Sequence, residues 1–147
     1  MKKQILTVVA AAALLGSVAA SAGQDFNVRI HNQTNDTLRA TLSNVACMND
    51  TGNLDKLSLA KGDTTQVQLE NKNSGSCALK TSAFTLTFYK GGLDTPPIGA
   101  INYASTANGN CTESGRHCFN STNGKSIPQP VLINGKDIGV DIYVNNP

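Results

Sequence analysis

Two histidines are the groups in this 147-residue sequence best suited to proton transfer near neutral pH. A serine or cysteine nucleophile also needs an orienting acid, and the sequence contains no G-x-S-x-G turn. His31 falls out of phase with the apolar residues around it, so we expect it to face solvent. His117 lies beside Arg116 in a polar segment. The sequence therefore favours a non-enzymatic protein, with a weak hydrolase resting on His117 as a lesser alternative.

Carboxylates are few, with eight Asp and two Glu. Asp137 and Asp141 alternate with apolar residues, so we expect both on the solvent face of a strand and not as a glycosidase-like acid pair. Residues 49–55 place oxygen ligands at alternate positions, but Ala60 stands where a calcium loop needs a bidentate acid. We interpret that stretch as a turn, and we expect neither a metal nor a cofactor.

Four cysteines allow three pairings. We favour a Cys111–Cys118 disulfide because six residues separate these two, a span that closes easily, and this leaves Cys47–Cys77. A zinc site is the alternative. It is disfavoured because neither C-x-x-C nor H-x-x-x-H spacing occurs.

The first 22 residues have the pattern of a secretory signal peptide. A basic start at Lys2 and Lys3 precedes an apolar run over residues 5–15, and a small-x-small cleavage site ends at Ala22. We therefore expect a bacterial protein that is secreted or periplasmic, with one disulfide-bonded β domain at residues 23–147. The pattern agrees with an oxidising compartment for the cysteines.

The net charge of the expected mature domain limits the classes of partner that we expect. The formal net charge of +2 is carried by Lys2 and Lys3, so the expected mature domain is formally neutral. Nucleic acid is an unfavourable partner, because its binders carry a basic excess. The chain has no Trp and no second long apolar segment, which argues against membrane insertion.

Period-two alternation of apolar residues predicts strands throughout the expected domain, and no helical period occurs. The predicted strands cover residues 26–32, 38–42, 54–60, 65–69, 77–89, 98–103, 131–133 and 136–144. We expect the first two to form an antiparallel hairpin and 77–89 to be central. The pattern predicts an all-β fold, a small antiparallel β-sandwich of about seven to eight strands, with a small β-barrel as the alternative.

The last two strands offer a register that can be checked. Asn134-Gly135 is the favoured two-residue hairpin turn. It pairs Ile133 with Lys136 and Val131 with Ile138, which places the apolar residues of both strands on one face.

One candidate recognition site is the loop at residues 91–97. It carries Leu93 and the rigid pair Pro96 and Pro97 between two strands. An apolar residue on a stiff tip loses little conformational freedom when it docks.

A second candidate is the loop at residues 108–123, with Arg116, His117 and Phe119 near the expected disulfide. Arginine and aromatic residues are common anchors of protein contacts. The two loops together predict a binding module for a protein or cell-surface component, of open oligomeric state. Two alternatives remain: a secreted hydrolase or protease inhibitor that presents Arg116, and a small membrane-active, toxin-like protein.

Overall fold

The computed structural model describes residues 25–105, 110–111, 117–122, 126–133 and 137–147. These residues form strands and two short 3-10 helices, with the following bounds: β1 (Asp25–Gln33), β2 (Leu38–Ala46), β3 (Met48–Asp50), η1 (Leu54–Lys56), β4 (Ser58–Leu59), β5 (Thr64–Asn71), η2 (Gly75–Cys77), β6 (Ala83–Lys90), β7 (Pro97–Ala104), β8 (Asn110–Cys111), β9 (Cys118–Ser121), β10 (Ser126–Ile133) and β11 (Asp137–Asn145).

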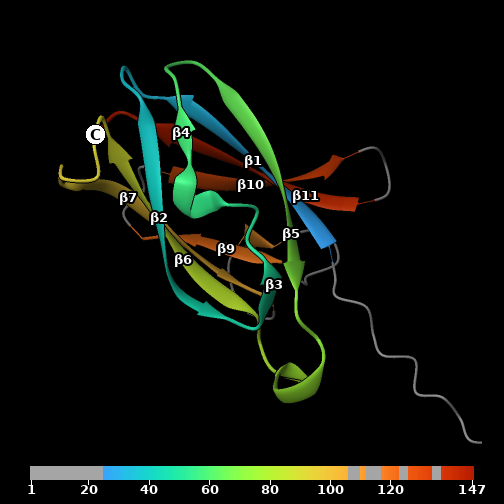
Figure 1. Ribbon diagram of the computed structural model, residues 1–147. Coiled ribbons are helices and arrows are strands. Elements are labelled where there is room, and N and C mark those ends of the chain that lie inside the picture. The colour runs from blue at the N-terminus through green and yellow to red at the C-terminus, as the bar shows by residue number, and fades with distance from the viewer. Residues whose placement is uncertain (1–24, 106–109, 112–116, 123–125, 134–136) are drawn as a thin grey trace, which may run out of the picture.

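Two sheets pack face to face, as Figure 1 shows. One has the order β10-β11-β1-β5-β3 and the other β4-β2-β6-β7-β9-β8. The predicted sandwich is confirmed, and the closed barrel is not formed. The sandwich has eleven described strands, more than the seven or eight predicted. Several of them are only two to four residues long, too short for the alternation to reveal. The predicted signal peptide lies outside the described residues.

The core forms where the predicted alternation is strongest. Phe26, Val28 and Ile30 on β1 are at most 1% exposed, as expected for a half-buried strand. β6 lies between β2 and β7, so the central position of this stretch is confirmed, although the strand begins at Ala83 and not at Cys77. Its residues Phe84, Leu86 and Phe88 fill the space between the sheets.

The predicted hairpin of the first two strands is wrong. β1 pairs with β5 in an antiparallel manner and with β11 in a parallel manner, whereas β2 belongs to the other sheet. The chain changes sheets at a polar corner organised by Asn32, which is buried. Its Nδ2 donates to the carbonyls of Asp36, Leu59 and Ala60 at 2.8, 2.9 and 3.0 Å, and its Oδ1 accepts from Thr34. These bonds satisfy the buried amide of Asn32 and stabilise the corner. The chain therefore crosses to the other sheet here instead of turning back as a hairpin.

Two further segments differ from expectation. Residues 54–60 form η1 and the two-residue β4 instead of one strand, because Leu54 and Leu59 enter the core from a tight turn. The loop predicted at residues 108–123 contains two short strands, β8 and β9.

The register of the last hairpin also differs by one residue. The predicted turn places Val131 opposite Ile138, but Val131 stands opposite Gly139, and Ile133 stands opposite Asp137. Three residues therefore connect β10 to β11 instead of two. A one-residue shift exchanges the two faces of a strand, so the predicted pairing of the apolar residues across the two strands is wrong. Val140, Ile142 and Val144 of β11 still share the core face as predicted. The predicted turn itself lies outside the described residues.

Within the part of the chain that the structure describes, no helix is long and apolar enough to span a membrane.

Candidate functional site

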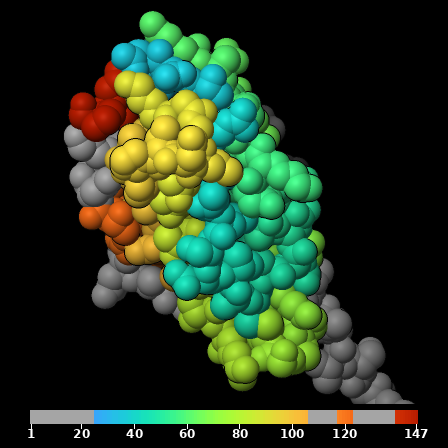
Figure 2. All heavy atoms as spheres, turned by 60° about the vertical axis from the view of Figure 1, so that its left-hand side comes forward, coloured from blue at the N-terminus to red at the C-terminus, as the bar shows by residue number. Residues whose placement is uncertain are grey.

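The loop at residues 91–97 lies at the surface, in yellow on the face that Figure 2 turns towards the viewer. The Leu93 side chain is 51% exposed, and Pro96 and Pro97 are exposed beside it. The structure thus leaves all three predicted residues of this loop accessible to a partner. Pro97 is already the first residue of β7.

Hydrogen bonds pin the tip of this loop. The backbone N–H of Gly91 donates to the carbonyl of Thr37 at 2.7 Å, which ties the loop to the corner between the sheets. The Thr95 hydroxyl lies 2.6 Å from the carbonyl oxygen of Gly92 and 3.1 Å from that of Lys90. These contacts fix the backbone on both sides of Leu93.

A shallow hollow of about 130 Å³ opens beside the loop on the outer face of the second sheet. Its lining is mostly small or apolar, with Thr87, Pro97, Gly99, Ala100 and Thr122. Because Pro97 belongs to both features, the tip and the hollow form one continuous surface.

The second predicted loop does not present its anchors to solvent. His117 is 4% exposed and Phe119 is fully buried, so their predicted role as surface anchors is wrong. The reason is β9, which pairs with β7 and turns both rings into the core, where His117 stacks on Phe26 at 4.2 Å between ring centroids. Arg116 lies outside the described residues, and the inhibitor interpretation that rests on it stays a prediction.

His117 instead joins a buried hydrogen-bond chain. The Tyr103 hydroxyl donates to Oδ1 of Asn71 at 2.9 Å, and Nδ1 of His117 lies 2.9 Å from the same hydroxyl oxygen. Since that hydroxyl has a single proton, Nδ1 of His117 is the donor in the second bond. Burial raises the pKa of Tyr103 well above its usual value, and the bond to Asn71 opposes this only in part. All three side chains are buried, so this hydrogen-bond chain lies within the core.

The disulfide between Cys47 and Cys77 is present as predicted, with 5.4 Å between the two Cα atoms. Cys118 is also disulfide-bonded, and the β8–β9 register places Cys111 opposite it. The side chain of Cys111 is outside the described residues, so its pairing with Cys118 stays a prediction.

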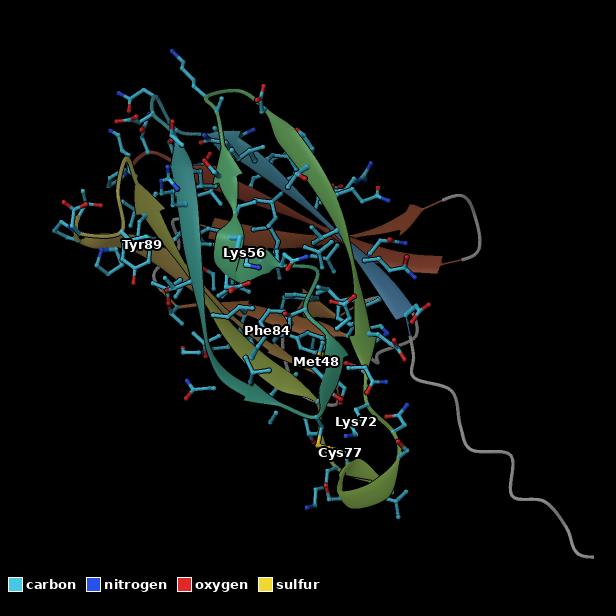
Figure 3. The ribbon with its side chains drawn as sticks, in the orientation of Figure 1. Met48, Lys56, Lys72, Cys77, Phe84 and Tyr89 are labelled. Atoms are coloured by element: carbon cyan, nitrogen blue, oxygen red, sulfur yellow. A yellow bond between two sulfur atoms is a disulfide. The ribbon has the colours of Figure 1, made fainter. Side chains whose placement is uncertain are left out.

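The Cys47–Cys77 disulfide lies at an end of the sandwich where the sequence predicted no recognition site. Figure 3 shows Cys77 and Lys72 at the neck of a loop that protrudes below Met48, whereas Tyr89 lies towards the other end of the molecule. β6 separates this loop from residues 91–97 by its eight residues, roughly 25 Å. The segment after Ala104 leaves from the same end as the protruding loop, because Ser105 and Ser82 bond each other's backbone.

Two exposed apolar side chains flank this disulfide. Leu79 is fully exposed and Val45 is 50% exposed. Each lies two residues from one of the bonded cysteines. One signal in the sequence could have found Leu79. Leu79 lies an even number of positions from Thr85 and Thr87, and an odd number from the core residues of β6. If β6 extended back to Leu79, the alternation would place this side chain on the outer face.

Positive φ angles gather at the same end. Asn44, Cys47, Gly75 and Leu79 have φ of 52°, 49°, 59° and 61°. Glycine and asparagine tolerate this left-handed region, but leucine rarely adopts it. The backbone is therefore strained at the residue whose side chain is most exposed.

A polar cluster covers the outer face of the first sheet. Asp141 alternates with the core residues Val140 and Ile142 and so lies on the outer face as predicted, but it is only 6% exposed. It is buried because β1 lies alongside β11: Arg29 Nη2 donates to one carboxylate oxygen at 2.8 Å, and His31 Nε2 donates to the other at 2.8 Å. His31 is half-buried, stacks on Tyr143 at 4.3 Å, and contacts the Thr64 hydroxyl through Nδ1 at 2.9 Å.

Carboxylates also line a second hollow, of about 220 Å³, formed by Asp25, Asp50, Gln68, Leu69 and Glu70. Among the described residues, no group of three His, Cys, Asp or Glu side chains has an arrangement that could hold a metal ion. The Asp50 carboxylate accepts from the backbone N–H of Gly52 at 2.8 Å, so residues 49–55 contain the expected turn.

Comparison with known proteins gives no family. No family model matches the chain, and no curated protein matches it. Among solved structures, the chain is similar to the crystal structure of IP-1A from Alcaligenes faecalis. The identity is 8% and the TM-score 0.48, over 86% of this chain and 95% of that one. A likeness at this level says nothing of what the chain binds.

Proposed function

We propose that this protein is an exported, non-enzymatic binding module that docks a protein or cell-surface component through residues 91–97. The observation that carries the proposal is Leu93, which is half exposed on a tip held by hydrogen bonds. An exposed leucine in isolation is ordinary. Here it belongs to the same loop as Pro97, which also lines the shallow hollow together with Gly99 and Ala100.

The magnitudes suit a modest, specific contact. Burying a leucine side chain contributes about 1.5–3 kcal/mol. Ordering a flexible, rotamer-rich side chain at an interface costs about 0.5–1.5 kcal/mol. Leu93 is 51% exposed in the free protein, so docking gains about half of the full burial energy, and the Thr95 and Gly91 bonds already meet the cost of ordering the loop backbone.

The cluster of Thr64, His31 and Asp141 is the arrangement in the described residues that most resembles a catalytic centre. A hydroxyl, an imidazole and a carboxylate follow one another in the order used for nucleophilic catalysis. Arg29 already engages the carboxylate at both oxygens, with Nε 2.8 Å from Oδ1 and Nη2 2.8 Å from Oδ2. That positive charge competes with the imidazolium that a catalytic carboxylate must stabilise, which supports a structural role. Equal ester hydrolysis by the wild type and by His31→Gln is expected.

The binding proposal is tested by immobilising the protein and capturing partners from the medium or periplasm of the cells that produce it. We expect Leu93→Asp to weaken capture of a retained component at least tenfold, because a charge replaces the apolar contact. Gln66→Ala, on the outer face of the other sheet, is the matched control and should leave capture unchanged. Capture that survives Leu93→Asp would contradict the proposal.

A further inference from the structure

We propose a second binding site at the opposite end of the sandwich: Val45 and Leu79, on either side of the Cys47–Cys77 disulfide, insert into an apolar pocket of a protein partner whose rim carries carboxylates. We call these two side chains, together with Lys72 and Lys80, the disulfide knob. The inference is independent of residues 91–97.

Exposure singles out these two side chains. Val45, Leu79 and Leu93 are the large apolar residues that the described part of the chain leaves exposed, and two of the three flank one disulfide. The cysteine Cα atoms are 5.4 Å apart, and each apolar residue lies two positions away, so their own Cα atoms are within about 20 Å. Figure 2 shows the two segments adjoining at the lower end of the molecule. This separation is within the span of a single protein interface, so one partner can contact both side chains.

The backbone conformation at Leu79 also supports a binding site here. With φ of 61° and a fully exposed side chain, Leu79 has an unfavourable conformation and no packing in the free protein to offset it. Glycine or asparagine would form the same turn at lower cost. Strain kept at an exposed position is typical of a site that is used in binding.

The knob is held rigidly at its neck. Besides the disulfide, the N–H of Lys72 donates to the carbonyl of Cys47 at 2.8 Å. Ser82 and Ser105 exchange two hydrogen bonds, of 2.8 and 2.9 Å, at the other stem. The apolar tip is thus presented in one arrangement, which reduces the entropy lost on docking.

The charge of the disulfide knob indicates which side chains surround the pocket of the partner. Residues 72–82 contain Lys72 and Lys80 and no acidic residue. The carboxylates of Glu70 and Asp50 lie outside this loop, on the neighbouring strands β5 and β3, where they accept hydrogen bonds from Nδ2 of Asn49 and the N–H of Gly52. A partner with carboxylates around its pocket complements the two lysines.

A protein pocket fits the knob better than a membrane surface does. Residues 72–82 contain no aromatic side chain to sit among lipid headgroups. One leucine and one valine bury less apolar surface than a single acyl chain, which itself anchors only reversibly. The left-handed backbone at Leu79 also differs from the extended chain that a protease binds as substrate, so the pocket receives a turn.

The experiment places a photo-reactive amino acid at position 45, 79, 66 or 93 of the full chain in cells that produce it. We expect one protein adduct of the same mass from positions 45 and 79, and its absence from positions 66 and 93. The adduct should fall at least tenfold on reduction of the disulfide, and likewise with Lys72→Glu and Lys80→Glu together. Only lipid-sized adducts, or no adduct shared by 45 and 79, would overturn the proposal. A different adduct at 93 reports on residues 91–97 separately.

Leu79→Gly separates binding from folding. With the photo-reactive group at position 45, this variant should lose the adduct at least tenfold while its Tm stays unchanged or rises, because glycine relieves the strain. Leu79→Met keeps an apolar side chain and should retain the adduct. A lower Tm for Leu79→Gly with an undiminished adduct would show that Leu79 serves the fold and not a partner.

Discussion

The hydroxyl oxygen of Tyr103 and Nδ1 of His117 lie 2.9 Å apart in the interior of the sandwich. This contact, with the bond from Tyr103 to Asn71, turns three polar side chains into part of the core. Buried polar groups are tolerated only when they are paired in this way. His117 therefore forms part of the core.

Tyr103→Phe should lower the free energy of unfolding by about 1–3 kcal/mol, because it leaves Asn71 Oδ1 and His117 Nδ1 without their shared partner. Urea denaturation followed by circular dichroism measures the change. Tyr89→Phe is the matched control. The Tyr89 hydroxyl lies 3.4 Å from that of Thr41 on the outer face, and its loss should change stability by less than about 0.5 kcal/mol. Equal losses in the two variants would contradict the network.

Alkaline titration should ionise Tyr103 only as the fold is lost. Burial raises the pKa of Tyr103 above the value of about 10 for an unfolded chain, so the folded state holds its proton longer. The stabilisation is complete below pH of about 10 and falls as the pH rises beyond it. Ultraviolet absorbance of phenolate and circular dichroism, recorded together, should show that one of the three tyrosines ionises in step with loss of β-sheet signal. Ionisation of all three with the sheets intact would refute this.

Asp141→Asn should lower the free energy of unfolding by about 1–3 kcal/mol. The substitution leaves the Arg29 guanidinium without its carboxylate, and the loss is below that of a fully buried pair because Arg29 is 35% exposed. A double variant that also carries Arg29→Gln should lose less than the two single losses combined, which unfolding in urea can measure. Asp63→Asn, at an exposed turn, serves as the control with little change. Strict additivity would argue against the pairing.

Removal of the Cys47–Cys77 disulfide should destabilise the fold by about 3.5 kcal/mol, for a sequence separation of 30 residues. The double variant Cys47→Ser with Cys77→Ser, compared with the wild type in thermal unfolding, measures this loss. The mature fold should remain, because its core lies between the sheets and away from this end. A double variant as stable as the wild type would show that the disulfide only shapes the knob.

Period-two alternation predicted the strands that face the core, since Phe84, Leu86 and Phe88 needed only local pattern to be placed. It did not predict which strands are neighbours. The sheet change at Asn32 depends on bonds to Leu59 and Ala60, which lie far along the sequence. No local signal distinguishes that corner from a hairpin turn.

The candidate sites were likewise predicted where the signal was local and missed where it depended on strand pairing. Leu93 was found because an apolar residue beside prolines in a loop is a local signal. His117 and Phe119 were misplaced because their polar surroundings hid a strand that pairs with β7. Leu79 was missed because it was included in the central strand, whose first residues instead form the protruding loop.

The parallel pairing of β1 with β11 sets the order in which this chain can fold. Arg29 and Asp141 are register partners 112 residues apart, so one long side of β1 has no neighbour until the last residues of the chain arrive. Such high contact order slows folding, because the loop must close before its contacts form. Until β11 pairs with it, this edge of β1 is open to pairing with other chains, so β11 protects the protein against aggregation.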